Sequence, residues 1–83
     1  MRIHLRVEKS TGEPIVVTTN AWDIVQFENT FDRSVTKFET EVKYGDLLWL
    51  AWRALTRQGV ETAEFDEWLK DVDSVEADEK DPK

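Results

Sequence analysis

The sequence predicts an α+β fold that is mainly α, with an N-terminal β-hairpin, about three helices in a small bundle, and an acidic, flexible C-terminus. Three observations lead to this prediction. Apolar and polar residues alternate near the N-terminus, later segments place apolar residues at helical spacing, and the final residues are dominated by charge. We expect one globular domain over 1–72, with the hairpin in 1–19 and the helices in 20–72, and a disordered tail over 73–83.

The hairpin is predicted from two short strand patterns. In residues 2–8, Ile3, Leu5 and Val7 alternate with polar side chains, which is the period of a strand with one buried face. A polar turn containing glycine and proline follows, and the β-branched run 15–18 then predicts the second strand. Because two strands alone are marginally stable, the apolar face of the hairpin must pack on another part of the chain.

A first helix is predicted over residues 21–31. Asn20 and Asp23 have the spacing of an N-cap and an acidic first turn. The segment 32–42 lacks a clear period, so we expect a connecting loop that Phe38 fixes to the core. The apolar face of this helix would consist of Ile24, Phe27 and Phe31.

The most hydrophobic part of the chain, residues 44–58, predicts a central helix, and Gly59 stands where a C-cap glycine belongs. Thr62 can cap a third helix. The core face of the central helix would consist of Tyr44, Leu47, Leu48, Ala51 and Leu55. The apolar face of the third helix would consist of Phe65, Trp68, Leu69 and Val72.

Composition and charge argue against several functional classes. The net charge of −7 and the lack of clustered Lys and Arg disfavour direct binding to nucleic acid. No stretch approaches the about 20 apolar residues of a membrane span, and no signal peptide is evident, so we expect a cytoplasmic protein. Cysteine is absent, and the single histidine, His4, lies on the polar face of the first strand. We therefore expect no metal site, no cofactor and no enzymatic activity.

The tryptophans are the most informative residues, because four in 83 is a high frequency and Trp often anchors interfaces. The central helix is apolar on more than one side. It could be the buried centre of the bundle, with Trp49 covered by the hairpin or by the third helix. Alternatively, an exposed apolar patch would bind a partner or a second copy of the chain. The candidate partner-binding residues are Trp22, Trp49, Leu50, Trp52 and Arg53.

Four segments resemble the tail assembly chaperones of long-tailed bacteriophages. They are WDIVQFE at 22–28, DLLWLAWRAL at 46–55, FDEWL at 65–69 and VDSVE at 72–76, so the likeness covers roughly residues 20–76. The most specific element is the LWLAWRAL run, followed by a short spacer and FDEWL.

The resemblance implies a non-enzymatic assembly factor that binds the tape measure protein, keeps it soluble and promotes assembly of the tail tube protein. Such chaperones are small helical proteins that can self-associate, and many have a longer form made by translational frameshifting. The resemblance places the protein in the cytoplasm of an infected bacterium and not in the mature virion.

Two other functions remain open from the sequence. The negative charge would also suit an acidic inhibitor or DNA mimic that binds a nucleic-acid-binding protein of the host, although 6 of the 18 acidic residues fall in the C-terminal segment 71–83. A structural head or tail component retained in the virion is the second alternative.

Overall fold

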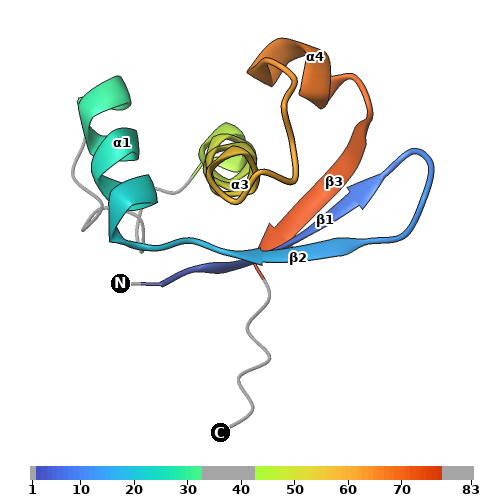
Figure 1. Ribbon diagram of the computed structural model, residues 1–83, viewed down its shortest axis with the longest axis horizontal. Helices are drawn as coiled ribbons and strands as arrows, with labels where there is room; N and C mark the ends of the chain where they lie inside the picture. The colour runs from blue at the N-terminus through green and yellow to red at the C-terminus, as the bar shows by residue number, and fades with distance from the viewer. Residues whose placement is uncertain (1, 33–42, 78–83) are drawn as a thin grey trace, which may run out of the picture.

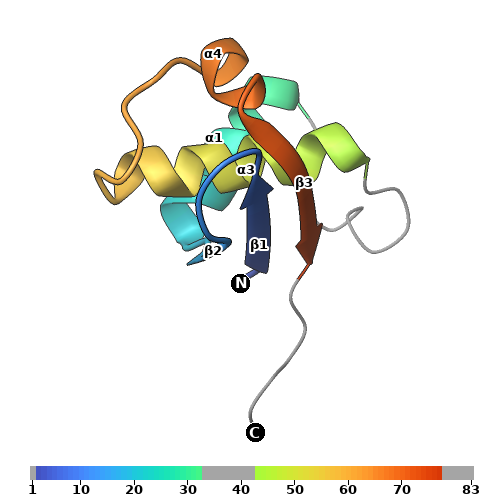
Figure 2. The same ribbon diagram turned by 90° about the vertical axis from the view of Figure 1, so that its right-hand side faces the viewer.

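The computed structural model describes residues 2–32 and 43–77 of the chain. These residues form two layers, a three-stranded antiparallel sheet and a layer of helices over one of its faces (Figure 1). The prediction of a mainly α protein with a helical bundle is therefore wrong. Helix α3 (Tyr44–Arg57) packs on the sheet with the other helices at its sides, and Figure 2 shows α3 crossing behind the strands. The expected loop at Phe38 lies outside the described residues.

The hairpin forms the first two strands of the sheet. Strand β1 spans His4–Lys9 and strand β2 spans Ile15–Thr18, and the two pair antiparallel with Leu5 opposite Val17. Leu5 and Val17 are buried against the helices, whereas the alternating polar residues of β1 face away from them. The strand period in the sequence thus identified the buried face correctly.

The third strand, β3, spans Val72–Ala77 and occupies the start of the expected tail. It pairs antiparallel with β1, so the sheet order is β2-β1-β3. A bulge adds Asp73 to β3, because Glu8 lies opposite Ser74 while the next residue of β1 lies opposite Val72. Because of the bulge, the inward-facing Val72 and Val75 are three positions apart. This spacing is also typical of one face of a helix, so the sequence pattern did not predict a strand here. Residues 78–83, the rest of the expected tail, lie outside the described residues.

Helix α1 spans Ala21–Phe31, as the sequence predicted, and a capping box begins it. The backbone N–H of Asp23 donates to Asn20 Oδ1 at 3.1 Å, and the backbone N–H of Asn20 donates to Asp23 Oδ2 at 3.0 Å. These bonds satisfy donors that the first turn would leave without partners. The direction of α1 is therefore set where the chain leaves β2.

Helix α3 spans Tyr44–Arg57 and ends one residue before the predicted boundary, with Gly59 at a φ of 79°. Helix α4 is short, Phe65–Leu69, and begins after Glu64 rather than after the predicted cap, Thr62.

The core lies between the sheet and the helices, with α3 at its centre. The small side chains Ala51 and Ala54 are fully buried, so they allow a close approach of α3 to its neighbours. The predicted core face of α3 is partly wrong, because Tyr44 is exposed while Trp49 and Leu50 are buried. The reason is that α3 packs on the sheet below and on α1 and α4 at its sides. The buried apolar residues are Leu5, Val7, Val17, Ile24, Phe27, Trp49, Leu50, Ala51, Ala54, Leu55, Trp68 and Val75.

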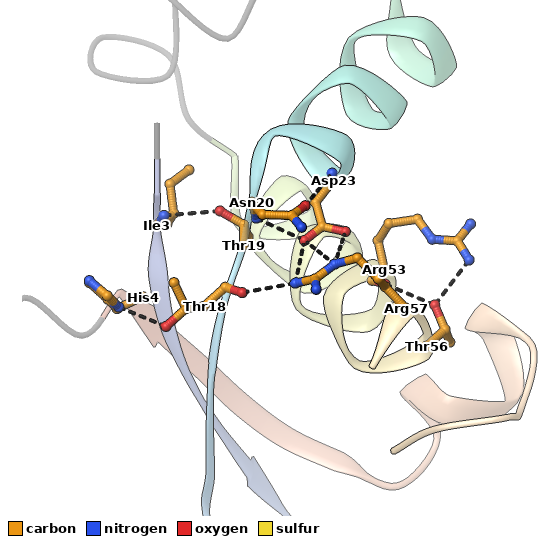
Figure 3. A network of polar contacts seen from close by, with 9 residues as sticks. All are labelled: Ile3, His4, Thr18, Thr19, Asn20, Asp23, Arg53, Thr56 and Arg57. Atoms are coloured by element: carbon orange, nitrogen blue, oxygen red, sulfur yellow. Dashed lines mark hydrogen bonds and ion pairs between the residues drawn. The ribbon is translucent and has the colours of Figure 1, made fainter. Parts of the chain in front are cut away.

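A buried ion pair joins the two layers at one end of α3 (Figure 3). The carboxylate of Asp23 is fully buried, and Arg57 Nε lies 3.0 Å from each of its oxygens. Arg57 Nη2 lies 3.0 Å from Asp23 Oδ2 and also donates to the carbonyl oxygen of Thr18 at 3.2 Å. One guanidinium therefore holds together α1, α3 and the end of β2.

Replacing Val75 by alanine tests whether β3 belongs to the folded domain. Val75 is 3% exposed and faces the helices, so Val75→Ala should lower the free energy of unfolding by about 2 kcal/mol through the lost burial and the cavity. Urea denaturation measures the change. The matched control is Asp73→Ala at the exposed bulge, which should change the free energy by less than about 0.5 kcal/mol. An unchanged stability of Val75→Ala would mean that this segment is a tail.

Candidate functional site

A cluster of two tryptophans and one arginine lies on the helical layer and forms the candidate site. Arg53 Cζ is 4.6 Å from the ring centre of Trp52 and 5.2 Å from that of Trp22. Both distances are within the range of a cation–π contact. Trp22 comes from α1, whereas Trp52 and Arg53 come from α3. We refer to these three residues as the tryptophan–arginine patch.

The five residues predicted to bind a partner divide into a surface group and a core group. Trp22 is 45% exposed, and Trp52 and Arg53 are half-buried. Trp49 is only 8% exposed and Leu50 is fully buried. Trp49 and Leu50 therefore belong to the core, while the other three residues come together at the surface. Trp49 still supports the patch from below, with its ring centre 6.0 Å from Arg53 Cζ.

The patch rests on a continuous series of aromatic contacts within the helical layer. Trp52 Nε1 donates to the carbonyl oxygen of Ala63 at 3.0 Å, which fixes the orientation of that indole. Phe65 packs edge-on against Trp52, with 5.5 Å between the ring centres. A rigid platform of this kind loses little conformational entropy when it binds a partner. The series runs through Phe27, Phe31, Trp49, Trp52, Phe65 and Trp68.

Arg53 has an unusual polar environment. Its Nη2 donates to Thr56 Oγ1 at 3.0 Å, and its Nε is buried without a hydrogen-bond partner. None of the ion pairs formed by the described residues includes Arg53, although the chain carries 18 acidic residues. The guanidinium is thus held by indole rings and one hydroxyl, and no carboxylate of the described part of the chain balances its charge.

Two further exposed apolar residues lie on α1 and were not assigned to the site from the sequence. Val25 is 48% exposed and stands three residues after Trp22, so both side chains lie on the same outward side of α1. Phe31 was expected in the core, but it is partly exposed and contacts Trp49 edge-on at 5.3 Å. The helical spacing of Trp22 and Val25 could have revealed this second apolar face.

The remaining polar groups give no sign of a metal centre in the described ranges 2–32 and 43–77, where no cluster of three or more His, Cys, Asp or Glu side chains has the required geometry. His4 Nδ1 lies 2.8 Å from Thr18 Oγ1 on the exposed side of the sheet. In the same ranges, the helices are too short or too polar to span a bilayer.

Alanine substitutions should distinguish the core tryptophan from the surface tryptophan. We expect Trp49→Ala to lower the free energy of unfolding by about 3–5 kcal/mol, because it removes a buried ring from the centre of the helical layer. Trp22→Ala should cost less than about 1 kcal/mol, because nearly half of that side chain is already in water. Urea denaturation followed by circular dichroism measures both. Equal losses would show that Trp22 is part of the core and not of a free surface.

Comparisons of the chain with protein-family models, with curated proteins and with solved structures find no match. What the protein does is therefore inferred from its residues and their arrangement.

Proposed function

We propose that this chain is a non-enzymatic binding protein that holds a segment of another protein on the tryptophan–arginine patch. One observation carries the proposal: an exposed indole and a half-buried indole contact a guanidinium that has no carboxylate partner among residues 2–32 and 43–77. Trp and Arg are the residues that most often dominate the binding energy of protein interfaces. Val25 extends the apolar surface along α1 beside Trp22.

The resemblance to tail assembly chaperones supplies the partner in this proposal, the tape measure protein, which the chain would keep soluble while the tail tube assembles. The sheet departs from the small helical protein that the resemblance implies. Two of the resembling segments nevertheless contribute the patch, because Trp22 lies in 22–28 and Arg53 lies in 46–55. The proposal places this activity in the cytoplasm of the infected cell, before the virion is complete.

Burial of apolar surface would supply most of the affinity. Covering the exposed parts of Trp22 and Val25 removes apolar area from water, and each 100 Å² contributes roughly 2.5 kcal/mol before the costs of association. The rigid support beneath Trp52 limits those costs. The net charge of −7 would keep a complex with an aggregation-prone partner dispersed, because like-charged complexes repel one another.

Co-expression with the tape measure protein tests the proposal. The wild-type chain should keep the partner soluble and co-purify with it. Trp22→Ala should weaken the complex about tenfold or more, because it removes the most exposed indole of the patch. The matched control is Val16→Ala, which changes an exposed apolar residue of the sheet and should leave the complex intact. Failure of the wild-type chain to solubilise or retain the tape measure protein would contradict the proposal.

A further inference from the structure

Two arginines one turn apart on α3 have opposite surroundings. Arg57 meets the buried carboxylate of Asp23, whereas Arg53 points away from that carboxylate toward Thr56 (Figure 3). The first arginine therefore has its counter-charge inside the fold. The second has none among the described residues, even though the chain is strongly acidic.

The guanidinium of Arg53 is held in a defined position but uses few of its donors. An arginine side chain carries five N–H donors in a planar fork that fits the two oxygens of a carboxylate. The rings of Trp22 and Trp52 contact the cation without replacing such an acceptor. Arg53 is a half-buried residue whose guanidinium is fixed beside two indoles, so its unused donors can bind a carboxylate of a partner.

We infer that the bound segment is an amphipathic helix whose Asp or Glu side chain pairs with Arg53, while an apolar side chain of the same helix packs on Trp22 and Val25. This inference rests on the proposed function, because it names the chemistry of the partner at the same surface. Charge complementarity selects the acidic residue, since the group at the centre of the patch is a cation that no described carboxylate of the chain pairs with.

The geometry of α1 explains why the acidic residue of the partner should have an apolar neighbour one helical turn away. Trp22 and Val25 present exposed apolar surface along α1, beside the guanidinium that Trp22 contacts. Residues three or four apart lie on one side of a helix, so a single partner helix can present both groups. The overall negative charge of the chain opposes an acidic partner only weakly. At physiological ionic strength, salt screens the charges that lie more than about 8 Å from the bound carboxylate.

The test is selection of helical peptides from a displayed library on the full wild-type chain. The selected peptides should share an Asp or Glu three or four positions from a large apolar residue. Replacing that Glu by Gln in a peptide, or making Arg53→Gln in the protein, should each weaken binding about tenfold or more. The two changes together should weaken binding no more than one alone, because both remove the same bond.

Control variants separate this inference from the proposed function. Arg6→Gln removes an arginine that is paired with Glu8 on the sheet, and it should leave peptide binding unchanged. Arg53→Lys keeps the charge but loses the planar fork, so several-fold weakening is expected. Circular dichroism should show that each variant is folded.

Four outcomes would overturn the inference. If Trp22→Ala abolishes binding while Arg53→Gln binds equally well, the patch binds protein segments but does not recognise a carboxylate. Selected peptides that share no acidic residue would lead to the same conclusion. If no peptide is selected, or if neither variant weakens binding, the proposed surface fails together with the inference.

Discussion

The buried ion pair between Asp23 and Arg57 is the constraint on which the rest of the structure depends. A fully buried carboxylate is costly unless a cation and hydrogen-bond donors surround it, and Arg57 provides both. The same guanidinium binds the last carbonyl of β2, so α1, α3 and the sheet meet at one point. Trp22 precedes Asp23 on α1, and Arg53 lies one turn before Arg57 on α3. The pair that aligns the helices therefore also brings Trp22 over Arg53 and so creates the patch.

Much of the fold could be predicted from local sequence patterns, and the errors of that prediction have local causes. The N-cap at Asn20, the bounds of α1 and α3, and the two strands of the hairpin follow from capping residues and from apolar periods. Strand β3 was missed because the bulge at Asp73 gives its valines a helical spacing and because its other residues are polar. Without that strand, a bundle was the natural way to cover the hairpin.

The candidate site was predictable in part. The density of tryptophans indicated a binding surface on α3, and three of the five proposed residues do meet at the surface. Leu50 was placed on the wrong side, because a helical wheel cannot show that α3 is covered from three directions. The pairing of Asp23 with Arg57 was also missed, since the two residues are 34 positions apart and each resembles an ordinary charge of a helix end. The sequence could not predict that Arg57 is paired with a carboxylate while Arg53 contacts indoles, because this difference depends on partners from other elements.

A double-mutant cycle across Asp23 and Arg57 tests the central claim most directly. The free energy of unfolding would be measured by urea denaturation for the wild-type chain, Asp23→Asn, Arg57→Gln and the double variant. If the pair joins the layers, Arg57→Gln leaves the buried carboxylate of Asp23 without its cation, Asp23→Asn leaves the half-buried Arg57 without its counter-charge, and the coupling energy should be at least about 2 kcal/mol. A coupling energy below about 0.5 kcal/mol, the value typical of an exposed pair, would contradict the account.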